Sequence, residues 1–343
     1  MNMKRIGYRS AVSRQTESLE IGRQAVAKAL DALDLSGFAV GTVGFAGIGA
    51  SYQAALAGAI YLRQLGRRGF AFAPTDLYGG ADAAADAFVA LSASGQSREI
   101  ADVMLEAENH PRLAICRAAD NPLAAITGAV IAMESGADNG ASSTGYTGTL
   151  LALGMLVEKI AGGTSSFEWG RLPQAVEAML ADVAGVAEQA ARLLAGRASI
   201  DIVGAGIGFA NAGEAAMLIR EAVRVPASGW DTLNYLHGPM ESQDARTGLV
   251  VFGDSREVKI AQDVAAFGCP SVLITRRTDI APAERLAVIS IPALGNAMAD
   301  GIVEIIALQM VVGDMQDAAG LTDITFRYRQ IDTKLKPWSP TEL

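Results

Sequence analysis

Residues 43–50 read VGFAGIGA, and residues 203–210 read VGAGIGFA. Each stretch is a short apolar run that passes through a glycine turn into a helical pattern, at 51–65 in the first case and at 211–225 in the second. A short apolar strand followed by a helix is the building block of α/β proteins with parallel sheets. The two stretches therefore predict two similar α/β units in one chain.

Further pairs of segments match at nearly the same spacing along the chain. The matched segments are AGIG at 46–49 and 205–208, SREI at 97–100 and SREV at 255–258, and ICR at 115–117 and ITR at 274–276. Three matches at almost one constant offset indicate an internal duplication. We expect each copy to form a parallel sheet flanked by helices.

Length and composition agree with two globular domains. The chain has 343 residues, of which 50% are apolar and 19% are charged. This is enough apolar material for large cores and too much for a disordered chain. The organisation we expect is an N-terminal helical segment at 1–35, a first domain at 36–166, a second domain at 173–325 and a C-terminal tail at 326–343.

Charge and rare residues exclude several classes of function. With 28 basic and 37 acidic residues and a net charge of −9, the chain does not attract nucleic acid or an anionic membrane. Two cysteines and two histidines are too few for a disulfide framework or a histidine-rich metal centre. We therefore expect no metal, no cofactor and a reducing, cytoplasmic location. Residues 35–62 carry no charge, but their six glycines predict strand, loop and helix rather than a membrane span.

Hydroxyl side chains and glycines gather in the loops of the first copy. In parallel sheets, ligands bind beyond the carboxyl ends of the strands, where helix N-termini offer unpaired N–H groups. The loops at 47–51 (GIGAS) and 92–97 (SASGQS) qualify, and 142–144 adds three hydroxyls. They predict a site for one phosphoryl group. The alternative is that these serines only cap helices.

The duplication offers an internal control for this site. The aligned pairs are Ser92 with Val250, Ser94 with Phe252 and Gln96 with Asp254. Since the second copy has lost the donors, we expect phosphate in the first copy only. A dinucleotide site is a competing interpretation of the glycine turns. However, Asp76, the first acidic residue after the first turn, lies farther on than the roughly 20 residues of a ribose contact.

The motifs in these loops and helices resemble those of a known family. The chain resembles a tandem sugar isomerase (SIS) domain protein and is similar to the isomerase half of glucosamine-6-phosphate synthase, over roughly residues 15–320. The motifs are GIGASYQAAL from 47, LSASGQSREI from 91, DNGASSTGYTGTL from 138, NAGEAAMLIREAV from 211 and LHGPMESQD from 236. The resemblance implies two tandem flavodoxin-like domains, a phosphorylated sugar as ligand and a homodimer.

The resemblance also implies roles for individual residues. The implied substrate-binding residues are Gly49, Ser51, Ser92, Ser94, Gln96, Ser97 and Ser143. Glu221 matches the general base that moves a proton between C1 and C2 of the open-chain sugar. His237 matches the ring-opening residue, which in the synthase enters the neighbouring subunit's site. For the lysine of the C-terminal tail, Lys334 and Lys336 are both candidates, and we take Lys336 as catalytic.

Departures from the synthase pattern leave the reaction open. Ala93 stands in place of a glutamine, and Leu218 stands in place of a lysine. Isomerisation, deamination of an amino-sugar phosphate and cleavage of a fructosamine phosphate are all compatible with this, as is a non-catalytic phosphosugar sensor. From local sequence alone, Glu221 could instead pair with Arg224 on a helix surface. A single histidine could likewise be structural.

Overall fold

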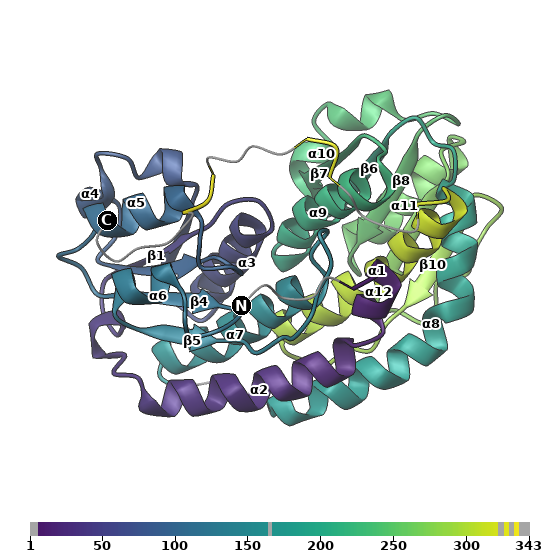
Figure 1. The fold of residues 1–343 in the computed structure, drawn as a ribbon. Coiled ribbons are helices and arrows are strands. Elements are labelled where there is room, and N and C mark those ends of the chain that lie inside the picture. The colour runs from purple at the N-terminus through teal and green to yellow at the C-terminus, as the bar shows by residue number, and fades with distance from the viewer. Residues whose placement is uncertain (1–5, 164–166, 322–325, 329–332, 336–343) are drawn as a thin grey trace. The chain divides into compact units, whose positions relative to one another are not determined.

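The computed structural model describes residues 6–163, 167–321, 326–328 and 333–335, and it divides into two compact units. We call the unit made of Glu17–Gly136, Thr144–Gly170 and Phe326–Leu343 the first unit. The second unit is made of Met1–Thr16, Ala137–Ser143 and Arg171–Thr325. Each unit contains one five-stranded sheet (Figure 1).

The sheet of the first unit is parallel, in the order β2-β1-β3-β4-β5. Its strands are β1 (Thr42–Ala46), β2 (Arg68–Phe72), β3 (Ala87–Leu91), β4 (Arg112–Cys116) and β5 (Val130–Ala132). Its helices are α2 (Gln15–Ala32), α3 (Ala50–Gln64), α4 (Ala81–Ala84), α5 (Arg98–Glu106), α6 (Pro122–Thr127) and α7 (Thr144–Ile160), with 3₁₀ turns at Ser36–Phe38 and Pro74–Asp76. The first two residues of α2 are assigned to the second unit. Every residue of the central strand β3 is buried, as expected of a parallel strand covered on both faces.

Alternate strand residues of the first unit point to two different helix layers. Phe88 and Ala90 of β3 pack in one cluster with residues of α4, α5 and α6. On β1, the Phe45 ring lies close to Gly58 of α3, which in turn lies against Leu153 of α7. Helices therefore cover both faces of the sheet (Figure 1), which is the doubly wound α/β arrangement.

The second unit repeats this arrangement with a sheet in the order β10-β9-β8-β6-β7, again parallel. Its strands are β6 (Ile200–Gly204), β7 (Ala227–Asp231), β8 (Gly248–Phe252), β9 (Ser271–Thr275) and β10 (Leu286–Ser290). Its helices are α1 (Tyr8–Val12), α8 (Leu172–Leu194), α9 (Ile207–Leu218), a π-helical turn at Ile219–Val223, α10 (Thr232–Tyr235), α11 (Arg256–Ala266) and α12 (Ala297–Ala318), with a 3₁₀ turn at Pro239–Ser242. A further 3₁₀ turn, Trp169–Arg171, crosses the division between the units.

The two sheets have the same topology when their strands are numbered in chain order. In both, the order is 2-1-3-4-5, which is the flavodoxin-like order. The prediction of two tandem parallel-sheet domains is confirmed. The nearly constant offset between the copies holds for β1 and β6 and for α5 and α11, but not for every element. Helices α3 and α9 begin at Ala50 and Ile207. Strands β3 and β8 begin at Ala87 and Gly248, which are separated by more residues. The connections between equivalent elements therefore differ in length.

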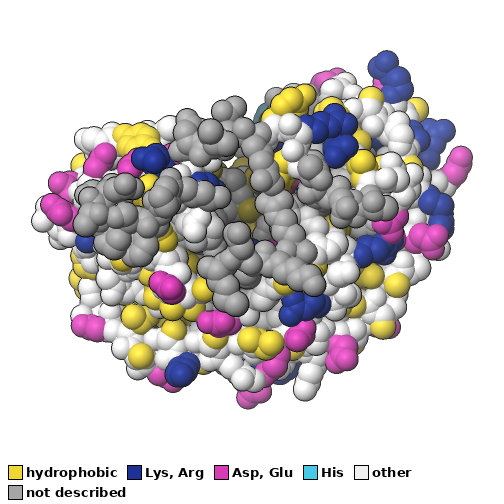
Figure 2. Space-filling view, viewed as in Figure 1, with side chains coloured by type: hydrophobic (Ala, Val, Ile, Leu, Met, Phe, Trp, Pro, Cys, Tyr) yellow, Lys and Arg dark blue, Asp and Glu magenta, His cyan; other side chains and the backbone are white. Residues whose placement is uncertain are grey.

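Three features of the chain concern its expected surroundings: its helices, its surface charges and its cysteines. None of the helices within the described residues is long and apolar enough to cross a membrane. On the face drawn in Figure 2, acidic and basic side chains are interspersed. Cys116 and Cys269 are both buried, unbridged thiols, as expected for small core residues.

Candidate functional site

The loops that follow β1 and β3 leave the same edge of the first sheet from neighbouring strands. Ala46 pairs with Ala90 at the carboxyl ends of β1 and β3. In this strand order the winding direction reverses between β1 and β3, and open parallel sheets bind ligands at such a switch point. The loops at 47–51 and 92–97, which we predict to hold phosphate, both begin there.

The 47–51 loop makes a turn that requires glycine at two positions. Gly49, which precedes α3, has φ +61° and ψ −130°, a conformation that is open to glycine and strained for other residues. A Cβ atom on Gly47 would lie 2.4 Å from the carbonyl oxygen of Ser51. Ser51 is half-buried in the first turn of α3. The turn thus places its hydroxyl at a helix N-terminus, where an anion is favoured.

The 92–97 loop brings two serine hydroxyls together. Ser92 is 3% exposed, and its Oγ lies 3.1 Å from the Oγ of Ser97, the residue before α5. Ser94 is exposed, and its Oγ accepts a hydrogen bond of 3.3 Å from the N–H of Gln96. Gly95 has φ +62° and allows the loop to turn. Three hydroxyls therefore surround the start of a nine-residue helix.

A segment from the end of the chain lies on this loop. Lys334 forms an antiparallel bridge with Ser97, and its Nζ lies 3.3 Å from the Ser97 Oγ. Of the two tail lysines, Lys336, the predicted catalytic residue, lies outside the described residues. The structure thus brings the other candidate, Lys334, to the predicted phosphate loop.

The corresponding loop of the second unit is shorter than sequence alignment suggested. β8 ends at Phe252 and α11 begins at Arg256, so three residues join them, against six between β3 and α5. Val250 and Phe252 are buried inside β8. The predicted equivalence of these two residues with Ser92 and Ser94 is therefore wrong. Ser255 precedes α11 as Ser97 precedes α5, but the shorter loop has no counterparts of the Ser92 and Ser94 hydroxyls.

A carboxylate of the chain itself occupies the shorter loop. Gly253 takes the place of Ser92. The Ser92 N–H donates to the carbonyl of Ile115 in β4, and the Gly253 N–H donates to the carbonyl of Ile274, the equivalent residue of β9. Asp254 then accepts hydrogen bonds from the Thr275 hydroxyl at 2.8 Å and the Arg276 N–H at 2.7 Å, and it pairs with the Arg276 guanidinium. Burial alone raises the pKa of Asp254, but these bonds hold it below its usual value. The donors at this edge are thus taken by an ionised side chain.

Glu221 lies in the π-helical turn Ile219–Val223 that continues α9. Such turns are rare and are frequent at functional sites. The side chain is half-buried, and this burial raises the pKa of the carboxyl to about 7, although the Arg220 guanidinium lowers it. Arg224, the alternative partner from local sequence, ends the turn with φ +63°. A carboxyl with a pKa near neutrality can accept and return a proton.

A second glutamate lies two helical turns before Glu221, on the same helix face. Glu214 is 1% exposed, and its Oε2 has no hydrogen-bond partner among the described residues. Burial, together with the carboxylates of Glu221 and Asp138, holds the pKa of Glu214 well above its usual range. Leu218, between the two glutamates, is also buried. Burial thus makes the Glu214 carboxyl a weaker acid than a glutamate in water, because charging a buried carboxyl is costly.

Ser143 belongs to this buried polar region of the second unit. Its Oγ donates to Asp138 at 2.7 Å, and its N–H donates to both oxygens of the same carboxylate at 3.1 Å. The Asp138 carboxylate also raises the pKa of Tyr8 and Glu214, after their burial. We call Tyr8, Asp138, Ser143, Glu214 and Glu221 the acidic cluster. The other six predicted binding residues lie in the first unit.

His237 is exposed at the end of a well-anchored turn. Asp231 caps α10 by accepting hydrogen bonds from the N–H groups of Leu233 and Asn234 at 3.0 and 3.1 Å. Tyr235 is fully buried, and the N–H of His237 donates to the Asn234 carbonyl at 3.1 Å. The imidazole is therefore presented to solvent by a fixed stretch of backbone.

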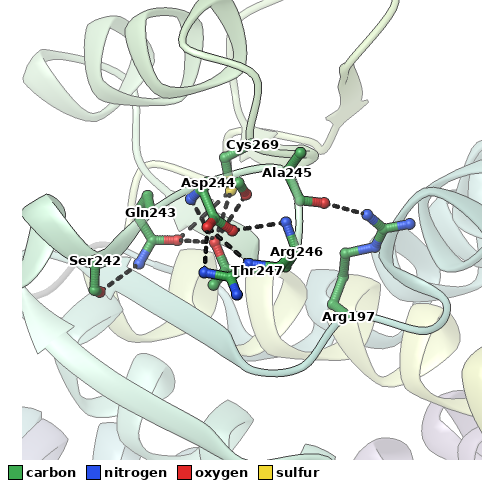
Figure 3. Close-up of polar contacts among 8 residues, drawn as sticks. All are labelled: Arg197, Ser242, Gln243, Asp244, Ala245, Arg246, Thr247 and Cys269. Carbon is green, nitrogen blue, oxygen red and sulfur yellow. Dashed lines mark hydrogen bonds and ion pairs between the residues drawn. The ribbon is translucent and has the colours of Figure 1, made fainter.

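The segment that follows His237 is held by side chains that converge on Cys269 (Figure 3). Thr247 donates its hydroxyl proton to Gln243 at 3.0 Å, and the Cys269 thiol lies 3.5 Å from the same amide oxygen. The Gln243 amide in turn donates to Asp201 at 2.7 Å. These contacts tie the segment to the sheet, and Cys269 has a packing role in them.

Sequence reasoning missed Tyr8, Asp138 and the contact of Lys334. The contact of Asp138 with Ser143 had a local signal, because both lie in the motif DNGASS, five residues apart. Tyr8 and Lys334 reach their clusters from the two ends of the described chain. Contacts at that separation leave no local pattern.

Comparisons with known proteins agree with the fold. The SIS domain family model matches residues 40–159. The C-terminal domain of glucosamine-fructose-6-phosphate aminotransferase from Francisella tularensis is 17% identical, with 92% of this chain and 97% of that chain covered and a TM-score of 0.82. Glucosamine-6-phosphate deaminase from Thermotoga maritima is 17% identical, with 92% and 95% covered and a TM-score of 0.72.

A tagatose-6-phosphate ketose/aldose isomerase from Escherichia coli is 16% identical, with 94% of this chain and 96% of that chain covered and a TM-score of 0.73. No curated protein matches the sequence. At these identities the structural likeness shows a common fold over nearly the whole chain. Substrate and reaction are separate questions.

Proposed function

We propose that this chain, whose residues 40–159 match the SIS domain model, is an enzyme acting on an amino or keto hexose 6-phosphate. The proposed reaction is proton transfer between C1 and C2 of the open-chain sugar, as isomerisation or as deamination. In this proposal the first SIS domain, at 36–166, binds the phosphate, and the second, at 173–325, carries out the chemistry. The solved structures with the same fold include an isomerase and a deaminase of sugar phosphates by name.

We assign phosphate binding to the loops at the switch point of the first sheet. Gly49, Ser51, Ser92, Ser94, Gln96 and Ser97 are the proposed ligands. A phosphate dianion needs several donors, and hydroxyls beside two helix N-termini supply them without a large positive charge. This explains how a chain of net charge −9 can bind a dianion.

The observation that carries the proposal is the environment of Glu221. Its carboxyl has a pKa of about 7 because it is half-buried, so both protonation states are populated near neutrality. In the proposed step, the Glu221 carboxylate removes the proton from C2 of the aldose form. The protonated carboxyl then returns it to C1. The cis-enediol thereby gives the ketose, whereas the enolamine gives a ketimine that water hydrolyses to the ketose and ammonia. A base that works in both directions is best placed at such a pKa.

We assign ring opening to His237, and to Ser143 a contact with the sugar. An imidazole can exchange a proton with the ring oxygen near neutral pH. The exposure of His237 is compatible with its serving the site of another subunit, so we propose a homodimer in which it does. Lys336 stays a proposed ligand of the substrate carbonyl.

Cleavage of a fructosamine phosphate is a second candidate, and the acidic cluster favours it. Leu218 occupies the position at which the synthase has a lysine, so Glu214 faces Glu221 and Asp138 without that cation. An interior lined by carboxyl groups, with a leucine in place of that lysine, can accept hydrogen bonds from a substrate that brings an amine. The released amine distinguishes this reaction from isomerisation.

The test is to incubate the protein with glucosamine 6-phosphate and to follow fructose 6-phosphate and ammonia together. Glu221→Gln should lower turnover at least about a hundredfold and leave phosphosugar binding within about threefold, as isosteric loss of the base requires. Glu177→Gln, on the exposed face of α8, is the matched control and should behave as wild type. Full turnover by Glu221→Gln would disprove the assigned base. Binding without turnover of any hexose 6-phosphate would indicate a sensor instead.

A further inference from the structure

The C-terminal segment 333–335 is fixed to the predicted phosphate loop by its backbone. The N–H of Leu335 donates to the Gln96 carbonyl at 3.1 Å, and the N–H of Arg98 donates to the Thr333 carbonyl at 3.3 Å. The Leu335 side chain packs against the hydrophobic cluster between the sheet and α4 to α6. Residues on both sides of Lys334 are therefore anchored, so its side chain starts from a defined place.

The ammonium group of Lys334 reaches the hydroxyls that we assign to phosphate. Its Nζ is 3.3 Å from the Ser97 Oγ, which is 3.1 Å from the Ser92 Oγ. These three groups form a short chain of donors at the start of α5. The loop sequence SASGQS contains no carboxylate.

Two positive features meet at this point in the first unit. The N-terminal end of a helix carries a partial positive charge, and the Lys334 ammonium lies beside Ser97, the residue before α5. An ammonium group and a helix N-terminus repel one another, and a dianion between them satisfies both. A phosphate on the serine hydroxyls would accept a charge-assisted hydrogen bond from the lysine.

We propose that Lys334 is a phosphate ligand of this protein, brought to the 92–97 loop by the C-terminal segment, and that it selects phosphorylated over unphosphorylated sugars. This inference rests on the proposed function, in which that loop binds the substrate phosphate. It gives the tail a role at the phosphate end of the substrate, distinct from the carbonyl contact proposed for Lys336.

The experiment measures binding of inorganic phosphate and of fructose 6-phosphate to the full chain by calorimetry. Lys334→Gln should weaken both by roughly tenfold to a hundredfold, the effect of losing a charge-assisted hydrogen bond. Lys334→Arg, which keeps the charge, should restore most of the affinity. Lys28→Gln, an exposed lysine on α2 of the same unit, removes the same charge and should bind as wild type.

Folding and binding effects are separated by the melting temperature. Lys334→Gln keeps the backbone bonds at 333 and 335, so its Tm without ligand should match wild type, while the rise in Tm caused by phosphate should shrink. With a turned-over substrate, KM should rise and kcat should change by less than about twofold. If wild type and Lys334→Gln bind both ligands equally, the inference is overturned and the proposed function stands. If wild type binds neither ligand, both fall together.

Discussion

The environment of Glu221 predicts the pH dependence of the reaction. The carboxyl has a pKa of about 7 because of its burial, against about 4.3 for a glutamate in water. The base form then makes up about half of the protein at pH 7 and about a tenth at pH 6. We therefore expect kcat/KM to fall about tenfold for each pH unit below about 7. An exposed glutamate would hold the rate level down to about pH 5.

The assay is the initial rate of product formation between pH 5 and 9, with phosphosugar affinity measured over the same range. The affinity measurement is necessary because the second ionisation of a phosphate ester, near pH 6, also changes the charge of the substrate. Arg220→Met serves as a second perturbation. The Arg220 guanidinium lowers the pKa of Glu221, so its removal should move the acid limb to higher pH.

Two outcomes would refute the assignment of Glu221 as the titrating base, and a third would refute the effect of Arg220. One is an acid limb with its midpoint near 4.5 once the substrate's ionisation is subtracted, because burial would then not control the base. The other is an unchanged acid limb in Glu221→Gln with substantial remaining activity, because another group would then titrate. Arg220→Met with a lower midpoint would contradict the sign of the charge effect.

Three further predictions concern binding and stability. Ser92→Ala removes a buried hydroxyl and should weaken phosphosugar binding about tenfold or more by calorimetry, with little change in Tm. Glu304 in α12 has a carboxyl whose pKa is raised to about 7 by burial, which the Asn211 hydrogen bond only partly offsets. The folded protein binds the proton of this carboxyl more tightly than the unfolded protein does. The contribution of the protonated Glu304 to stability is therefore present below about pH 4.5 and is lost as pH rises through about 7. In urea unfolding, the free energy of unfolding of the wild type should therefore fall between pH 5 and pH 8. In Glu304→Gln this decrease should be smaller by up to about 3 kcal/mol. Gly47→Ala should cost about 1–3 kcal/mol, since its Cβ would meet the Ser51 carbonyl, while Gly80→Ala has open space at its Cβ and should be nearly neutral.

The fold could be predicted because its signals are local. The apolar runs that became β1, β3, β6 and β8 are short and bounded by turns, and buried parallel strands have this pattern. The repeat then predicts the same sheet twice. The residue-by-residue alignment of the two copies failed in the loops after β3 and β8. Connections can gain or lose residues without disturbing strand pairing, so the offset between the copies changes there. The error placed Val250 and Phe252 in a loop, although their apolar side chains suit the buried strand in which they lie.

The candidate site could be predicted where its residues are close in sequence. Ser92, Ser94 and Ser97 fall within one loop, and their clustering was visible without a structure. Glu221 was predicted from the family resemblance, whereas its local sequence favoured a surface residue paired with Arg224. Its half-buried place in a π-helical turn depends on packing that a local pattern does not encode. Tyr8 joins Glu214 from the opposite half of the sequence, and no local feature marks it.

The two copies of one topology carry different side chains at the carboxyl end of their third strand, and we propose that their tasks differ. In the first copy, six residues join the third strand to its helix, and their hydroxyls lie at the switch point. In the second copy, three residues join the same elements, and Asp254 takes the donors that an anion would use. A carboxylate already held by Arg276 repels a phosphate and costs free energy to displace. The second sheet is thereby closed to the ligand that the first is proposed to bind. In the second copy, Glu214 of α9 and Glu221 of the π-helical turn that continues α9 lie in a setting that raises the pKa of both carboxyls.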